Sequence, residues 1–162
     1  MPDYSWFKQP VPEGLKVKQV YGICFSDDGR VILRIEDGQY KLTGGKPENT
    51  ETFEQTLKRE YIEELNIELK EINYLGYFLV QENDERYAQV RMIAKIKTIN
   101  EQKTDPATGK IYGRELVEIE KIKTCLNYQD EAGNKMIDDA ISMAKETFIN
   151  SFSKSKLDCF CI

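Results

Sequence analysis

Hydrophobic residues recur along the 162-residue chain in two kinds of pattern. Runs rich in β-branched and aromatic residues predict strands, and apolar residues spaced three and four apart predict helices. The predicted strands cover residues 17–25, 30–35, 39–42, 67–80, 87–98 and 116–122, and the predicted helices cover residues 52–65 and 133–152. Strands interrupted by helices in this order favour an α/β sandwich, in which helices cover both faces of a mixed β-sheet.

Polar segments separate these elements. Thr43-Gly44-Gly45-Lys46-Pro47 predicts a loop, and residues 100–113 predict a longer polar loop. The length fits a single domain. We expect residues 1–14 to form a loosely ordered extension and residues 153–162 a loosely ordered tail. The tail ends in Cys-Phe-Cys-Ile, the outline of a prenylation motif, but no polybasic cluster adjoins it, which favours a frayed end.

Composition and charge exclude several classes of function. The chain carries 28 acidic and 23 basic residues, a net charge of −5, which argues against broad binding to nucleic acid or anionic membranes. No segment approaches the roughly 20 apolar residues of a membrane span, and no signal pattern is present, so we expect a cytoplasmic protein with reduced cysteines. Cys24 lies in an apolar run and is expected in the core. The absence of histidine excludes Ser-His-Asp catalysis and histidine-ligated zinc.

The helix at residues 52–65 has clear ends. Thr52 and Gln55 form a capping box, and Asn66 stands where a left-handed residue ends a helix. Its apolar side chains share one arc of the helical wheel, which must face the core. These residues are Phe53, Leu57, Tyr61 and Leu65.

Three glutamates lie on or near that apolar arc. Glu64 falls inside it, Glu60 on its border and Glu63 close by, whereas Arg59 falls on the wrong side to neutralise all three. Burying unpaired carboxylates costs several kcal/mol, and like charges at these spacings repel. We therefore expect a hard divalent cation, because Mg²⁺ accepts oxygen ligands and keeps waters and phosphates in its shell. The alternative is a solvated acidic stripe.

The segment from residue 45 to residue 67 resembles the Nudix box. The match covers both the spacing and the charged positions of that family's motif. It consists of Gly45, five residues, Glu51, seven residues and then Arg59-Glu60-Tyr61-Ile62-Glu63-Glu64-Leu65-Asn66-Ile67. Three positions depart from it: Asn66 replaces the last glycine, Tyr61 occupies an apolar position, and Thr43 stands where proline is common.

The resemblance implies one Nudix hydrolase domain over residues 1–162, with a MutT-like α/β/α sandwich. It implies Mg²⁺-dependent cleavage (Mn²⁺ being an option) of a pyrophosphate bond in a nucleoside diphosphate linked to another moiety. Glu60 and Glu64 would hold the metal, helped by Glu63 and the carbonyl of Gly44, and Glu63 or Glu60 would activate water. The Gly44-Gly45 turn would bring backbone close to the metal. Gly45, Glu51 and Arg59 would support the box.

Residues outside the box complete the expected site. Many Nudix enzymes add a further acid, for which Glu115 is the first candidate and Glu118 the second. Candidates for phosphate or base contacts are Arg34, Lys46, Arg91, Arg114, Tyr87 and Tyr112. The expected partner is a small nucleotide such as an oxidised nucleoside triphosphate, ADP-ribose or a dinucleoside polyphosphate, without a membrane or nucleic acid, and a homodimer stays open. The alternatives are a nucleotide-binding module of weak or no activity and an interaction protein.

Overall fold

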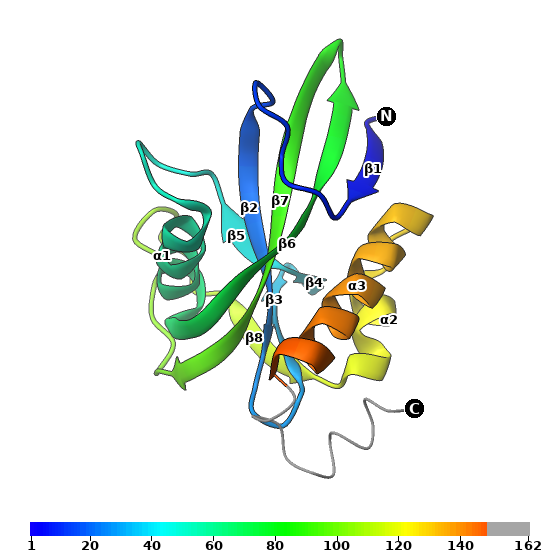
Figure 1. Cartoon of the computed structure of the whole chain (residues 1–162). Coiled ribbons are helices and arrows are strands. Elements are labelled where there is room, and N and C mark those ends of the chain that lie inside the picture. The colour runs from blue at the N-terminus through cyan, green and yellow to red at the C-terminus, as the bar shows by residue number, and fades with distance from the viewer. Residues whose placement is uncertain (149–162) are drawn as a thin grey trace.

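The computed structural model describes residues 1–148, which form one mixed sheet covered by helices on both faces (Figure 1). The strands run in the order β1-β6-β7-β2-β3-β4, while β5 pairs with β2 and β8 with β3. β2 and β7 are parallel and the other pairs are antiparallel. The strands are β1 (Asp3–Phe7), β2 (Val17–Phe25), β3 (Val31–Glu36), β4 (Gln39–Lys41), β5 (Thr43–Gly45), β6 (Ile67–Glu82), β7 (Glu85–Ile99) and β8 (Gly113–Val117).

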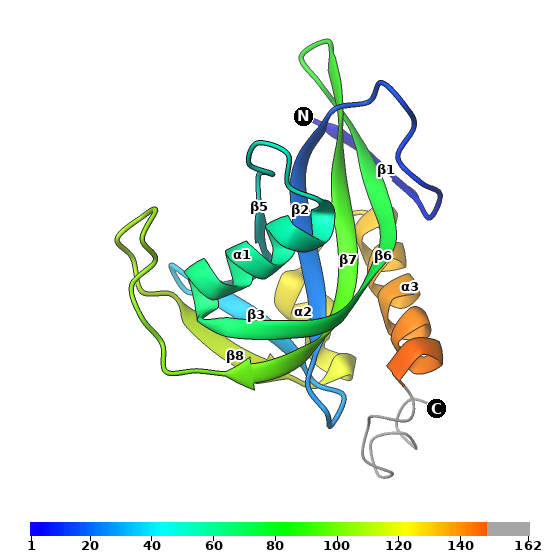
Figure 2. The ribbon, with the colours of Figure 1, turned by 60° about the vertical axis from the view of Figure 1, so that its left-hand side comes forward.

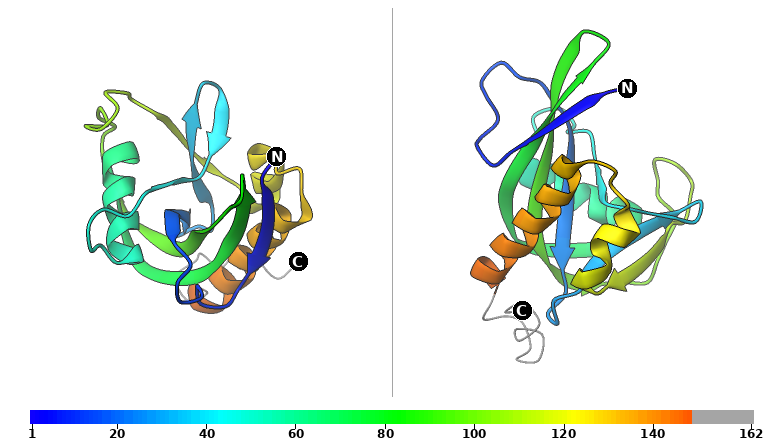
Figure 3. Two further views of the ribbon diagram at one scale, coloured as in Figure 1. Left: turned by 90° about the horizontal axis from the view of Figure 1, so that it is seen from above. Right: turned by 90° about the vertical axis from the view of Figure 1, so that its right-hand side faces the viewer.

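The helices divide the interior into two cores. α1 (Phe53–Leu65) covers one face of the sheet, and α2 (Ile122–Leu126) and α3 (Glu131–Phe148) cover the other (Figures 2 and 3). Leu57, Tyr61 and Leu65 pack into the core under α1, whereas the apolar side of α3 packs into the second core. The expected α/β/α sandwich with a mixed sheet is confirmed. None of the helices within residues 1–148 is long and apolar enough to cross a membrane.

The ends of α1 form as the sequence predicts. The Thr52 hydroxyl accepts a hydrogen bond from the Gln55 amide at 3.1 Å, and the Gln55 side chain accepts one from the Thr52 amide at 2.9 Å. Asn66 ends the helix with a left-handed backbone, φ 52°. Tyr61 fits at its apolar position because its hydroxyl reaches β2 and donates to the Gly22 carbonyl at 2.9 Å.

The N-terminal segment differs from the expectation of loose order. Residues 3–7 form β1, which adds to the edge of the sheet by pairing with β6. Trp6 holds it there, because its ring packs on Phe78 with centroids 4.9 Å apart and its indole N–H donates to Asp139 at 2.8 Å. Residues 149–152 of the second predicted helix, and the tail at 153–162, lie outside the described residues.

The Gly44-Gly45 segment also differs from the predicted loop, because residues 43–45 form the short strand β5 beside β2. Neither glycine has a positive φ, so glycine is not required here for a left-handed backbone conformation. A Cβ on Gly44 would clash with the backbone carbonyl of Val20 on β2. The missing side chain therefore permits the close approach of two strands.

The predicted strand at residues 116–122 is the remaining error. β8 ends at Val117, and the chain continues as a 3₁₀ turn (Ile119–Lys121) and α2. Ile119, Ile122 and Leu126 are spaced three and four apart and pack on the core beside α3. This spacing suits a helix better than a strand.

Candidate active site

The three box glutamates of α1, Glu60, Glu63 and Glu64, are screened from water in the order that the helical wheel predicts. The exposed fractions of the side chains are 9% for Glu64, 14% for Glu60 and 27% for Glu63. Burial is the largest influence on two of them and raises the pKa of Glu60 and that of Glu64, the latter to about 7. Their charge is therefore expensive unless a cation lies beside it.

Arg59 lies closer to this cluster than the sequence predicts. Its Nη1 donates to Glu60 at 2.9 Å and to Glu63 at 3.2 Å, while its Nε donates to Glu51 at 2.8 Å. Nη2 also reaches the Lys46 carbonyl at 3.0 Å. Hydrogen bonding from Arg59 holds the pKa of Glu51 at about 2, so the carboxylate that anchors this arginine stays ionised. Arg59 thus ties α1 to the segment that precedes it.

Glu64 has a different cation. Arg34 of β3 donates from Nη1 to Glu64 at 2.6 Å, and the Gly44 amide lies 3.4 Å from the other carboxylate oxygen. Arg34 opposes the pKa rise at Glu64 that burial causes. Two arginines thus stand against three glutamates, and Arg59 also pairs with Glu51, so negative charge remains for a divalent cation to offset.

β5 lies directly against these carboxylates. A Cβ on Gly45 would overlap the Glu60 carboxylate, so glycine lets Glu60 keep its present position. The neighbouring Gly44 presents its amide to Glu64. The two glycines thus bring backbone to the acidic face of α1, through contact rather than through a turn.

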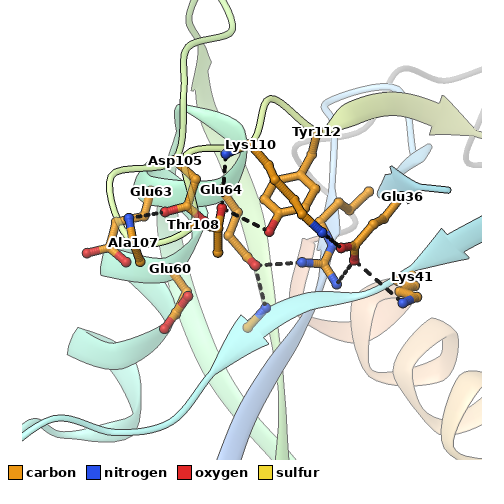
Figure 4. Close-up of polar contacts among 12 residues, drawn as sticks. Glu36, Lys41, Glu60, Glu63, Glu64, Asp105, Ala107, Thr108, Lys110 and Tyr112 are labelled. Atoms are coloured by element: carbon orange, nitrogen blue, oxygen red, sulfur yellow. Dashed lines mark hydrogen bonds and ion pairs between the residues drawn. The ribbon is translucent and has the colours of Figure 1, made fainter.

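Asp105 is the acid that sequence reasoning missed. It lies in the loop between β7 and β8, is 2% exposed, and lies beside Glu64 in Figure 4. Its charge raises the pKa of both Glu60 and Glu64. The Ala107 amide donates to Asp105 Oδ1 at 2.8 Å and holds the carboxylate in place. The only signal in the sequence is an acid beside a proline in a polar loop, which does not distinguish it from other loop acids.

Glu115 does not join the cluster. It lies opposite Leu33 in the β3–β8 pairing, and Leu33 belongs to the core under α3, so both residues face away from α1. The exposed Glu115 carboxylate accepts a hydrogen bond from Tyr40 at 2.9 Å. Glu118 follows β8 at the start of the 3₁₀ turn. The further acid on the α1 side is therefore Asp105.

The other candidates have separate surroundings. Arg34 and Arg91 both line one cavity of about 420 Å³. Lys46 is exposed. Tyr87 is buried, and the Lys18 ammonium lies 4.2 Å from its ring centroid.

The last two candidates support the site from the side. Arg114 donates to the Leu65 carbonyl at the end of α1, and the Arg34 guanidinium carbon lies 4.8 Å from the Tyr112 ring centroid. Only the two cavity arginines are placed to meet a ligand there.

The donor set fits a hard divalent cation of the kind that Nudix proteins generally use. Carboxylate oxygens lie together on one side of α1. Burial makes their negative charge costly there, so a bound cation would stabilise it. Within the described chain, no three carboxylate or thiolate side chains converge closely enough to hold an ion by themselves. An ion here would complete its shell with water and substrate oxygens, as Mg²⁺ commonly does.

Comparison with known proteins agrees with this arrangement. The NUDIX domain family model matches residues 16–138. A search of curated protein sequences gave no match. Solved structures resemble the chain in fold. One is the pyrophosphohydrolase BsRppH of Bacillus subtilis, in a glutamate-to-alanine mutant, with TM-score 0.68 and 22% identity over 86% of this chain and 90% of that one.

Two further structures have the same fold. A NUDIX hydrolase from Nitrosomonas europaea has TM-score 0.62 and 18% identity, covering 79% of this chain and 90% of its own. A MutT structure from a comparison of Aliivibrio salmonicida and Vibrio cholerae has TM-score 0.54 and 22% identity, covering 76% and 94%. With the family model matching most of its length, the chain belongs to the Nudix family, whose hydrolases act on pyrophosphate bonds.

Proposed function

We propose that this protein is a Mg²⁺-dependent hydrolase that cleaves a pyrophosphate bond in a nucleoside diphosphate linked to another moiety. One juxtaposition carries the proposal. The three box glutamates of α1 and Asp105 form an acidic cluster that Arg34 joins to a cavity of about 420 Å³. Three residues lining that cavity are cationic (Arg34, Lys41 and Arg91) and none is acidic, in a chain of net charge −5. A cavity of this charge suits an anionic substrate.

The acidic cluster supplies the groups that the reaction needs. Bound Mg²⁺ would offset charge on the diphosphate and lower the pKa of a coordinated water. Glu60 and Glu64 are the proposed ligands, and Asp105 lies beside Glu64. The Gly44 carbonyl stays a proposed ligand from the sequence. Glu63, the most exposed of the three glutamates, is the proposed proton acceptor, and Glu60 is the alternative.

Arg34 and Arg59 hold these carboxylates before the ion enters. Arg34 pairs with Glu64, so its guanidinium is available to a phosphate once a cation takes over that carboxylate. Arg59 keeps its bonds to Glu51 and orients Glu60 and Glu63. The cytoplasmic location and a homodimer stay predictions of the sequence.

The test is product analysis on the purified full chain. A panel of nucleoside triphosphates, ADP-ribose and dinucleoside polyphosphates is incubated with Mg²⁺, with Mn²⁺ or with EDTA. We expect nucleoside monophosphate to form only with a divalent ion, and Glu63→Gln to reduce the rate. Glu54→Gln is the matched control, since Glu54 is exposed on the same helix and makes only a surface ion pair with Lys58.

Two results would contradict the proposal. Full turnover in EDTA would exclude a role for the metal. Nucleotide binding by calorimetry without product across the whole panel would favour the binding module that the sequence leaves open.

A further inference from the structure

Arg91 of β7 is a buried cation without an acidic partner. It is 6% exposed, and no carboxylate within residues 1–148 lies at ion-pair distance from its guanidinium. The guanidinium carbon lies 4.7 Å from the Tyr21 ring centroid and 4.9 Å from that of Phe78. Its Nε has no hydrogen-bond partner, and Nη1 makes one long bond of 3.4 Å to the Val90 carbonyl. The Arg91 side chain also hydrogen-bonds with Tyr128. The unpaired Nε–H is costly to bury and points to a ligand as its acceptor.

Two cavities meet at Arg91. The first is the cationic cavity, which extends to Arg34 beside Glu64. The second, of about 220 Å³, shares Gln89, Arg91 and Tyr128 with it. A ligand whose diphosphate lies near Arg34 can therefore place its other end in the second cavity.

The second cavity suits a flat ring rather than a phosphate. Three of its lining side chains are aromatic: Tyr4, Phe78 and Tyr128. Asp130 also lines it, and a carboxylate there would repel a phosphate. The volume is sufficient for a nucleobase, and aromatic side chains bind nucleobases through their faces.

The N-terminal strand closes this cavity. Tyr4 of β1 meets the Phe78 ring edge-on, with centroids 6.2 Å apart. β1 precedes residue 16, where the match to the family model begins. This wall of the cavity thus lies outside the residues that the family model matches.

We propose that the second cavity binds the base of a guanine nucleotide and that Arg91 determines this specificity. Guanine presents two acceptors, O6 and N7, which match the parallel donors of an arginine, whereas adenine presents an amino group in place of O6. The N1–H and N2 amino groups of guanine are donors, which Asp130 can accept. The proposal rests on the proposed function, because it assigns the substrate class of that site.

The test compares GMP with AMP by calorimetry on the full chain in Mg²⁺. Neither carries a pyrophosphate bond, so the result is independent of hydrolysis. We expect GMP to bind at least about tenfold more tightly, within the range of one bidentate base contact. IMP should bind at an intermediate affinity, because it lacks the N2 amino group that donates to Asp130 in the proposed complex.

Variants of Arg91 sharpen the result. Arg91→Met should lower GMP affinity to the level of AMP, and Arg91→Lys should also lose most of the preference because it lacks the paired donors. Arg86→Met, exposed on the same strand, should leave the GMP preference unchanged. Thermal melts check that each variant folds, and Arg91→Lys keeps the charge should Arg91→Met fail to fold.

Equal affinity of the wild-type protein for GMP and AMP would overturn the inference. An equal weakening of both ligands by Arg91→Lys would do the same, since it would assign Arg91 to the phosphate. Loss of hydrolysis in the substrate panel, with the GMP preference intact, would instead contradict the proposed catalytic function and leave the base site standing.

Discussion

Two regions of this molecule bury charge in opposite ways. On the α1 side, each of the three box glutamates has an arginine within hydrogen-bond distance. In the second cavity, Arg91 lies between two aromatic rings with no carboxylate at ion-pair distance in the described chain. The first region supplies an arginine to each glutamate but keeps an excess of negative charge. The second leaves a buried guanidinium without a carboxylate partner among residues 1–148.

The largest expected effect comes from removing one negative charge from the acidic region beside α1. Glu64→Gln removes the most buried negative charge among the three box glutamates with little change of shape. We expect kcat to fall by roughly 100-fold or more while the fold is retained, which is the scale for losing a preorganised charged group. Steady-state kinetics in Mg²⁺ beside the Glu54→Gln control measures it. An undiminished rate would remove Glu64 from the site.

The second prediction compares the stability lost when Arg34 is replaced with that lost when Arg91 is replaced. Arg34→Met leaves Glu64 without its cation and should lower the free energy of unfolding at pH 8 by about 3 kcal/mol. Arg91→Met should change it by no more than about 1 kcal/mol, because it loses two ring contacts and weak hydrogen bonds but strands no carboxylate. Urea denaturation in EDTA tests both. Equal losses would show that the two regions do not differ as described.

The third prediction separates the two glycines of β5. Gly44→Ala meets the rigid backbone of Val20 and should destabilise the fold by about 2–3 kcal/mol. Gly45→Ala meets the end of the Glu60 side chain, which can move, so stability should change little while kcat falls roughly tenfold. Denaturation and kinetics on both variants distinguish the outcomes. The reverse pattern would mean that β5 does not position Glu60.

The smallest expected effect is a pH dependence of the metal-free protein. The pKa of Glu64, near 7 in the folded state, is above its ordinary value of 4.5, so the folded state holds that proton more tightly than the unfolded state does. This stabilisation is complete below pH 4.5 and is lost as the pH rises to about 7. We expect a loss on the order of 2 kcal/mol over this window. The difference between wild type and Glu64→Gln in urea melts at pH 5 to 8 isolates it.

Much of the fold and of the acidic helix could be predicted from the sequence, because both depend on local pattern. Helix phase alone ordered the burial of Glu60, Glu63 and Glu64 correctly. Capping chemistry likewise predicted both ends of α1. These features are encoded within a few turns of one helix.

The errors arose where distant segments decide the outcome. β8 begins at Gly113, before the predicted start at residue 116, and its pairing with β3 puts Glu115 on the face opposite α1. Asp105 lies in a loop without periodicity, so only the folded chain shows that it reaches Glu64. Arg34 is 30 positions from the carboxylate it pairs with, a relation that no local pattern expresses.

Asn66, where the family's motif has glycine, has a consequence beyond ending a helix. Its side chain donates to the Glu101 carbonyl at 2.7 Å, and its own carbonyl accepts from the Asn100 amide at 3.1 Å. Glycine could end the helix equally well but could make only the second of these bonds. The asparagine thus anchors the start of the Asp105 loop to the end of the helix that carries the glutamates. This bond fixes the two segments that bear the acidic side chains relative to each other.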